Sequence, residues 1–295
     1  MPPAPIAHKQ DYALLLLLAL IWSTSFLLIK VGVETIHPIT LTLGRLVLGG
    51  ALLGAIAWSR GNLLPRGLRQ WGIAAFVGVI GNALPFTLIQ WGEKTIDSGL
   101  AAIFMGVMPV WVAVLAHFLT NERLTFNRSI GVIMAFAGLI VLIGPDALGE
   151  LGVQLIAQLA VVGGAICYAV NSVYVRRQGA VPLYPIAASS LFIGALLLLP
   201  VELLLVSDSL HSASLPSWLA MLILGVFHTG LAALIYFRLI ARVGATLFSQ
   251  VNYIIPVLGV FWGAILLNEQ PGWQEGLALM MILGGLFFIN QRARA

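Results

Sequence analysis

The sequence predicts an all-α integral membrane protein with ten transmembrane helices, arranged as two inverted five-helix repeats. Three observations predict this fold: a hydrophobic fraction of 60% beside a charged fraction of only 9%, a series of long apolar stretches, and a pattern that recurs in the two halves. A water-soluble domain carries about 25% charged residues. So few charges cannot cover a surface in water, and we therefore expect lipid to surround much of this chain.

Each predicted span holds about 20 mostly apolar residues, the length that crosses the hydrocarbon core of a bilayer. Turn-forming residues such as Gly144-Pro145 and Pro271-Gly272 separate the spans. The first stretch is longer than a signal-peptide core and lacks a small-residue cleavage site, so we expect it to be retained. The predicted spans are Asp11–Val33, Pro38–Trp58, Arg69–Ile89, Ser98–Leu119, Asn127–Ile143, Gln154–Arg176, Tyr184–Val206, Pro216–Leu239, Ala245–Leu267 and Trp273–Asn290.

The basic residues predict which way the spans run. With the N-terminus placed inside, twelve Lys and Arg residues fall on the inner side, and only Lys30 and Lys94 fall outside. Because cytoplasmic loops are enriched in Lys and Arg, we expect both termini in the cytoplasm. Arg45 lies within the second span, and Glu93 is expected in an outer loop.

The second half of the chain echoes the first at a constant offset of 147 residues. Because each half holds five spans, an odd number, the second half must insert upside down. Inverted repeats are the architecture of secondary transporters, in which the substrate site lies near the midplane between the halves. A duplicated bundle that transports nothing is the alternative. The matched pairs are Gly78-Val79 with Gly225-Val226, Leu100 with Leu247, Pro109-Val110 with Pro256-Val257, Asn121-Glu122 with Asn268-Glu269, and Gly138-Leu139 with Gly285-Leu286.

Two motifs carry a family resemblance that covers nearly the whole chain. They are Ile21-Trp22-Ser23-Thr24-Ser25-Phe26 with Lys30, and Pro109 followed by Asn121-Glu122-Arg123-Leu124, which recurs as Pro256 followed by Asn268-Glu269. The chain resembles the drug/metabolite transporter superfamily in its ten-helix, EamA-type branch. That resemblance implies one EamA-type repeat at 1–145 and another at 146–295. It also implies export of aromatic or other neutral amino acids, or of related small metabolites, across a bacterial inner membrane.

Composition and spacing argue against several other functions. The single cysteine, Cys167, excludes a disulfide or a cysteine metal site within one chain, and we expect it to be a small buried residue. The basic residues lie in short loops and not in a patch with exposed aromatics, so no nucleic acid partner is expected. No nucleophile–base set or metal cluster converges in the spans, so we expect no enzyme, metal or cofactor. A membrane sensor or scaffold remains the alternative of another class.

Polar and aromatic side chains inside the spans mark a candidate substrate site. Polar groups in lipid need a partner or a water-filled cavity, so we expect these side chains to point inward. Each Asn or Gln is equally suited to an interhelical hydrogen bond and to a substrate contact. For Trp22 and Phe104, the alternative to substrate contact is packing against other helices. The candidate substrate-binding residues are Trp22, Ser25, Asn82, Phe86, Phe104, Met108, Tyr168, Asn171, His228, Gln250, Asn252 and Tyr253.

This set is aromatic, amide-rich and nearly free of charge, which suits a neutral amino acid with an apolar side chain. Arg45 either reaches the membrane surface or pairs with a polar neighbour. Because no Asp or Glu is expected mid-span, we expect transport by facilitated diffusion or by weak proton coupling through His228. The alternative roles of His228 are a hydrogen-bonding residue of the cavity and a structural hydrogen-bond donor. The runner-up substrates are lipophilic cations and nucleosides. The expected partners are the substrate and membrane lipid, with a monomer as the working assumption.

Pro109 and Pro256 occupy matching places in the fourth and ninth spans. Each proline removes a backbone hydrogen bond from its helix, which makes bending easier. We expect both to be hinges of an alternating-access motion, with a static kink as the alternative. The Asn-Glu motif that follows each proline is expected to be a helix-end device.

Overall fold

The computed structural model describes residues 8–61, 64–120, 122–144, 152–179, 181–206 and 212–291, without side-chain detail at residues 240, 241 and 244–247. Every regular element in these ranges is a helix, which confirms the predicted fold class. The first half contains α1 (Lys9–Val33), α2 (Pro38–Ser59), α3 (Gly67–Phe76), η1 (Val77–Ala83), α4 (Leu84–Glu93), α5 (Ser98–Met105), α6 (Met108–Leu119) and α7 (Phe126–Ile143). The second half contains α9 (Val153–Gln178), α10 (Leu183–Leu205), α11 (Leu215–Ile223), η2 (Leu224–Leu231), α12 (Ala232–Phe248), α13 (Val251–Leu266) and α14 (Trp273–Asn290).

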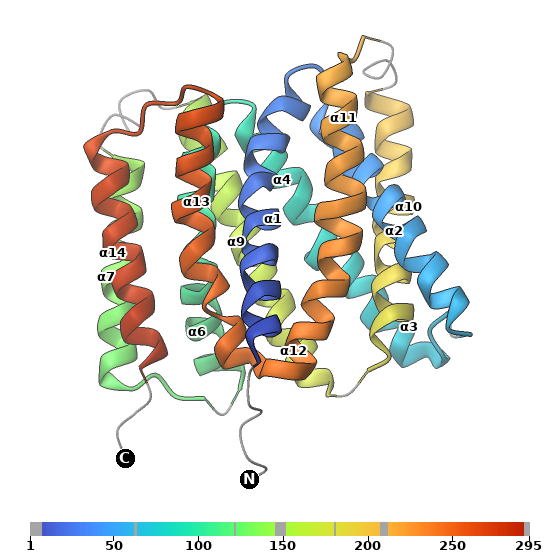
Figure 1. Cartoon of the computed structure of the whole chain (residues 1–295), viewed down its shortest axis with the longest axis horizontal. Coiled ribbons are helices and arrows are strands. Elements are labelled where there is room, and N and C mark those ends of the chain that lie inside the picture. Colours follow the sequence, from blue (N-terminus) through green and yellow to red (C-terminus); the bar gives the residue numbers. More distant parts are fainter. Residues whose placement is uncertain are drawn as a thin grey trace.

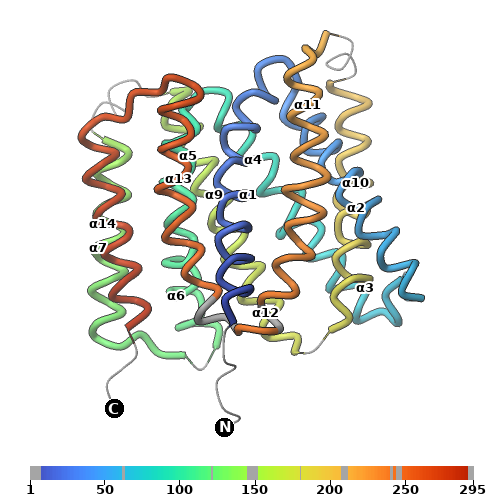
Figure 2. The backbone as a smooth tube through the Cα atoms, viewed as in Figure 1, coloured from blue at the N-terminus to red at the C-terminus, as the bar shows by residue number. Residues whose placement is uncertain are grey.

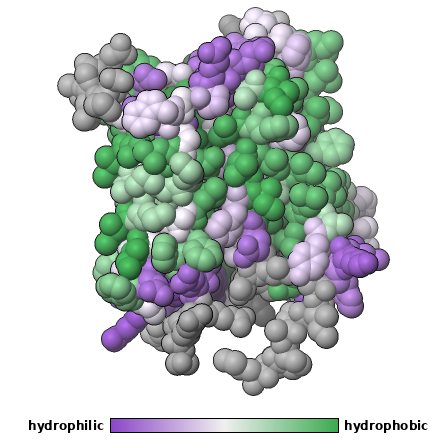
Figure 3. Space-filling view, turned by 60° about the vertical axis from the view of Figure 1, so that its left-hand side comes forward, coloured by the Kyte–Doolittle hydropathy of each residue, from purple (hydrophilic) through white to green (hydrophobic). Residues whose placement is uncertain are grey.

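In the described chain, nine helical stretches are long and apolar enough to cross a membrane, and α13 is a shorter apolar helix of 16 residues. Segments α3, η1 and α4 join into one such stretch, as do α5 and α6. On the side shown in Figure 3, a mostly hydrophobic band lies between hydrophilic groups at top and bottom. In Figure 1, α1 begins and α14 ends on the same side of the bundle. We call this side the terminal face and the other side the opposite face.

The two halves are related by an approximate two-fold arrangement of their helix pairs. Helix α7 packs on α14 and α2 packs on α10, so the fifth and second helices of each half meet their own counterparts. The other contacts are matched: α1 packs on α13 as α9 packs on α5 and α6, and α2 packs on η2 as α10 packs on η1. Figure 2 shows α7 and α14 running together at one end of the bundle. Inverted repeats require this exchange of partners.

Small residues let α7 and α14 approach closely. A Cβ added to Gly131 or to Gly285 would strike a backbone carbonyl of the other helix, and one added to Gly138 would lie 3.1 Å from the carbonyl oxygen of Ala278. At the offset of 147 residues, Gly131 corresponds to Ala278 and Gly138 corresponds to Gly285. The contact of Gly131 with Gly285 is therefore equivalent to that of Ala278 with Gly138, and the two are related by the two-fold axis. Close backbone packing of this kind holds helices together where lipid supplies no hydrophobic driving force.

Each half contains one π-helical segment, and the two segments begin at Val77 and Leu224, which are 147 residues apart. In each, a polar side chain satisfies the first carbonyl: Asn82 Nδ2 donates to Val77 O at 3.0 Å, and Thr229 Oγ1 donates to Leu224 O at 2.9 Å. Asn82 also donates to Ser190 Oγ at 3.2 Å, which links η1 to α10. The Asn82 amide is therefore engaged in interhelical hydrogen bonding.

Two boundaries differ from the sequence prediction. The sequence places the end of the third span at Ile89, but α4 continues to Glu93 because Lys30 caps its end: Nζ donates to the carbonyls of Glu93 at 3.0 Å and of Ile96 at 2.7 Å. The Glu93 side chain is therefore fully buried and does not lie in an outer loop. In the second half, α12 runs past the predicted start of the ninth span to Phe248, and α13 begins at Val251.

Candidate functional site

Arg45 lies at the centre of the candidate site. It is 5% exposed, and its guanidinium carbon lies 4.1 Å from the ring centroid of Phe86. Tyr168 packs edge-on against the same ring, with the two centroids 6.4 Å apart. The face of an aromatic ring attracts a cation through its quadrupole. Arg45 therefore points into the bundle and not toward the membrane surface, and the predicted residues Phe86 and Tyr168 lie beside it.

His228 joins α1 to η2 next to this group. Its Nε2 lies 3.0 Å from Thr24 Oγ1, and its Nδ1 lies 3.3 Å from the carbonyl oxygen of Ile223. The ring is 8% exposed, and the charge of Arg45 acts on it. With both nitrogens engaged, the imidazole is held in one orientation between the two helices.

A second set of polar groups lies further along α4, toward the opposite face. Gln90 and Glu93 are fully buried, and Thr42 Oγ1 donates to Gln90 Oε1 at 2.8 Å. Among the described residues, four buried atoms of this set have no hydrogen-bond partner: Arg45 Nε, Gln90 Nε2 and both carboxylate oxygens of Glu93. The i+4 spacing places Gln90 on the same face of α4 as Phe86. Glu93 lies on that face too, but the sequence prediction misses it because hydropathy ends the span one turn earlier.

Trp22 belongs to an aromatic cluster that extends from the site along α12. Its ring centroid lies 6.1 Å from that of Tyr236 and 6.0 Å from that of Phe248. Ser25 Oγ donates to the carbonyl of Trp22 at 2.6 Å, so this hydroxyl is used within its own helix. Asn171 lies against η1, and its Oδ1 is another buried atom without a hydrogen-bond partner in the described chain.

Two of the predicted residues lie in the packed core. Phe104 is fully buried, and Met108 packs against the hydrophobic cluster that joins α5, α9 and α14. Pro109 stands in the first turn of α6, directly after the break between α5 and α6. Pro256 lies inside α13, which continues without a break. The helix is therefore interrupted next to Pro109 and continuous through Pro256. A hinge at either proline stays a prediction.

The last three predicted residues lie at the start of α13, near the terminal face. Gln250 is exposed, and Asn252 and Tyr253 are partly buried. Asn290 Nδ2 of α14 donates to the Tyr253 hydroxyl at 2.7 Å. The structure therefore divides the predicted set, with Phe86, Tyr168 and His228 together around Arg45 and these three residues apart from them. The described residues hold no group of three or more His, Cys, Asp or Glu side chains suited to a metal ion.

On the opposite face, Glu269 joins the ninth helix to the fourth. Its carboxylate accepts hydrogen bonds from the backbone N–H of Ser98 at 2.8 Å and of Gly99 at 2.9 Å, at the N-terminus of α5. Asn268 turns the chain back toward α5 with a φ of 56°, a left-handed conformation that asparagine adopts more readily than most residues. In the second half, the Asn-Glu motif is therefore a helix-end device that also closes the contact between α5 and α13.

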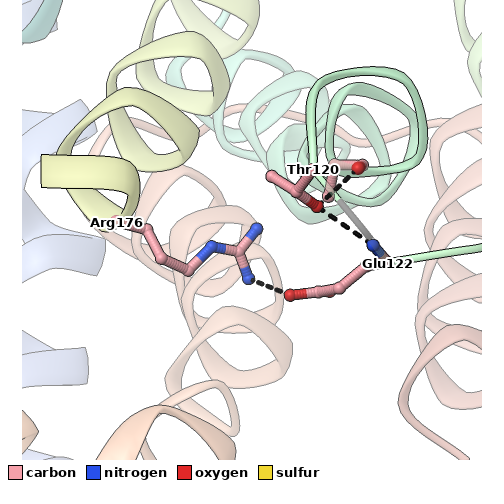
Figure 4. A network of polar contacts seen from close by, with 4 residues as sticks. Thr120, Glu122 and Arg176 are labelled. Atoms are coloured by element: carbon pink, nitrogen blue, oxygen red, sulfur yellow. Dashed lines mark hydrogen bonds and ion pairs between the residues drawn. The ribbon is translucent and has the colours of Figure 1, made fainter. Parts of the chain in front are cut away.

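The matching Glu122, on the terminal face, makes a different contact. Its Oε1 lies 2.9 Å from an Arg176 guanidinium nitrogen at the end of α9, and the two side chains are 51% and 46% exposed (Figure 4). Its backbone N–H donates to Thr120 Oγ1 at 3.2 Å. The main neighbours of α6 are α9, α7 and α14, and not α13. The fourth and ninth helices are thus joined on the opposite face by a helix cap, and the described contacts of Glu122 include no matching cap.

Comparison with known proteins shows the family to which the chain belongs. The model of the EamA-like transporter family matches residues 11–144 and 155–291, once in each half. The chain is 24% identical to "Uncharacterized transporter YoaV" of Bacillus subtilis, over 91% of this chain and 92% of that protein. It is 24% identical to the "Probable terminal-alkyne amino-acid exporter" of Streptantibioticus cattleyicolor (94% and 92%) and 29% identical to "Protein PagO" of Salmonella typhimurium (93% and 90%). A protein of known crystal structure shares the fold, with a TM-score of 0.67 and 22% identity over 96% of this chain and 98% of that one.

Proposed function

Since the chain belongs to the EamA-like transporter family, within the drug/metabolite transporter superfamily, we propose that it exports aromatic or other neutral amino acids by alternating access. It works as a secondary transporter in the bacterial inner membrane, with both termini in the cytoplasm. The positive-inside distribution of Lys and Arg supports this orientation.

One observation carries the alternating-access mechanism: the helix pairs obey a two-fold relation, but among the described residues the closing contact of the fourth and ninth helices is seen on the opposite face. Glu269 caps α5, whereas Glu122 is turned out toward Arg176. In inverted-repeat transporters, the two halves exchange conformations, so that closure on one face alternates with closure on the other around a fixed site. With the termini in the cytoplasm, the described conformation is closed to the outside.

The side chains around Arg45 support a neutral amino acid as the substrate. Phe86 and Tyr168 offer aromatic surface, and the hydrogen bond between Thr24 and His228 holds α1 against η2. One relative, the probable terminal-alkyne amino-acid exporter, is named for amino acid export. The buried carboxylate of Glu93 favours a second candidate, export of lipophilic cations, because an intramembrane carboxylate can balance a positive charge.

The test is efflux from proteoliposomes loaded with radiolabelled neutral amino acids, lipophilic cations or nucleosides. We expect efflux of phenylalanine, leucine or a related amino acid above that from protein-free liposomes. Phe86→Leu should weaken it several-fold by removing the aromatic surface beneath Arg45, and Phe126→Leu, at a residue that is 80% exposed, should leave it unchanged. Efflux confined to the cations would replace the proposal with the second candidate.

A further inference from the structure

Arg45, Gln90 and Glu93 are buried together, yet each keeps polar atoms without a partner in the described chain. We propose that these three residues bind the charged backbone of the transported amino acid, with its carboxylate on Arg45 and Gln90 and its ammonium on Glu93. This inference rests on the proposed function, and it assigns recognition of the amino acid head group to residues outside the aromatic set.

The unpartnered atoms match the two charges of an amino acid. Arg45 Nε and Gln90 Nε2 are donors, which a carboxylate accepts, and the two Glu93 oxygens are acceptors, to which an ammonium donates. Hydrogen bonds between charged partners are about twice as strong as neutral ones. A single zwitterion therefore satisfies all four atoms, whereas a lone cation or a lone anion satisfies only the acceptors or only the donors.

Arg45 and Glu93 do not pair with each other: no ion pair joins them in the described chain. Lys30, the other cation near Glu93, donates to the backbone carbonyls of Glu93 and Ile96, and Glu269 adds a further negative charge. Charges inside a membrane protein are costly and mark binding or transport sites when they persist. Two buried groups of opposite sign that form no ion pair with each other both keep atoms available to a ligand.

Packing of α2 on α4 brings the three side chains to one region of the bundle. The Thr42–Gln90 hydrogen bond fixes α2 against α4, and Arg45 lies one turn from Thr42 on the same face. The Arg45 guanidinium rests on Phe86, which lies two turns before Glu93 on the same face of α4. Gln90 stands on that face between the ring that carries Arg45 and the carboxylate.

The second half of the chain lacks this set. At the offset of 147 residues, Phe192, Phe237 and Ile240 stand where the first half has Arg45, Gln90 and Glu93. The supports of the fold occur in both halves, as the Gly131 and Gly138 contacts and the two π-helical segments show. The polar set therefore occurs once, although the packing of the bundle is two-fold. A residue set that serves one substrate site, and not the fold, is expected to occur once.

The test uses three matched competitors of efflux from proteoliposomes: phenylalanine, phenethylamine, which lacks the carboxylate, and 3-phenylpropionate, which lacks the ammonium. Leucine, 3-methylbutylamine and 4-methylpentanoate form a second trio. We expect the wild type to prefer each amino acid over both of its analogues by about 10- to 100-fold, the effect of losing one charged hydrogen-bonded partner. Arg45→Gln should abolish the preference over the amine and keep that over the acid, and Glu93→Gln should do the reverse.

Exposed residues of the same type supply the controls. Arg60 lies over the Tyr184 ring at 4.4 Å on the terminal face, and Glu34 is exposed, so Arg60→Gln and Glu34→Gln should keep the wild-type preferences. If Arg45→Gln does not fold, Arg45→Lys, which keeps the charge but loses the planar fork, should narrow the same preference. Equal weakening of all three competitors, or a Glu93→Gln effect on pH dependence alone, would overturn the inference. Absence of amino acid efflux from the wild type would instead overturn the proposed function.

Discussion

The helix cap at Glu269 offers a direct test of alternating access. Replacing Glu269 with glutamine keeps the size and shape of the side chain but removes its charge. The backbone N–H groups of Ser98 and Gly99 now bind different carboxylate oxygens, at 2.8 and 2.9 Å, and glutamine replaces one of these oxygens with an NH2 donor, so one N–H loses its acceptor. We expect the contact between α5 and α13 to weaken and the opposite face to open more often.

The size of this effect follows from the contacts that are lost. A hydrogen bond to a charged group contributes about 1.5–3 kcal/mol, and a negative charge at a helix N-terminus contributes about 0.3–1 kcal/mol more. A loss of about 2 kcal/mol shifts the equilibrium between closed and open forms by about 30-fold. Glu122→Gln is the matched control, because its pair with Arg176 is half exposed, and such surface pairs contribute at most about 1 kcal/mol.

The measurement is the rate at which a membrane-impermeant thiol reagent, added at the opposite face, labels a single cysteine. Val260→Cys in a Cys167→Ala background places this cysteine on α13 beside Gly99 of α5. Labelling should accelerate about 30-fold with Glu269→Gln and at most about fivefold with Glu122→Gln. An unchanged rate with Glu269→Gln, or equal acceleration by both variants, would refute the role of Glu269 as the closing contact.

Three further predictions concern stability, measured as the midpoint of thermal unfolding in detergent. Burial, with the charges of Glu269 and Glu275, raises the pKa of Asp97 above its ordinary value of 3.8. The folded protein then holds this proton more tightly than the unfolded chain, so stability falls as pH rises from 3.8 through the folded pKa. Asp97→Asn should therefore stabilise the protein at neutral pH and lose that advantage below pH 3.8. Thr24→Val and His228→Gln should be coupled in a double-mutant cycle by about 0.5–1.5 kcal/mol, the contribution of one hydrogen bond, and additive effects would contradict it. Gly131→Ala should cost about 1–3 kcal/mol by overpacking against α14, whereas Gly276→Ala, with open space around its Cβ position, should not destabilise.

The fold could be predicted because its two main determinants are visible in the chain itself. Hydropathy fixes the number of spans, and the offset of 147 residues relates the two halves. The π-helical segments at Val77 and Leu224 could not be predicted, because they depend on which side chain reaches the first carbonyl. The break at Ser249-Gln250 also departs from the offset, which by itself places the start of the ninth helix near Ala245. Local helix ends depend on tertiary contacts that hydropathy does not register.

The candidate site shows the same limit more sharply, because one contact decides where its carboxylate lies. Hydropathy assigns Glu93 to a loop, and that assignment makes Arg45 seem to be an isolated cation. Lys30 reverses both conclusions: by donating to the carbonyls of Glu93 and Ile96 it extends α4 by a turn and carries a carboxylate into the bundle. A lysine near the end of one span can therefore cap the neighbouring helix. In this chain, an ionisable residue within one turn of a predicted span end belongs to the interior because the adjacent span supplies a cation, so a set of mid-span residues without a carboxylate does not exclude a charged site.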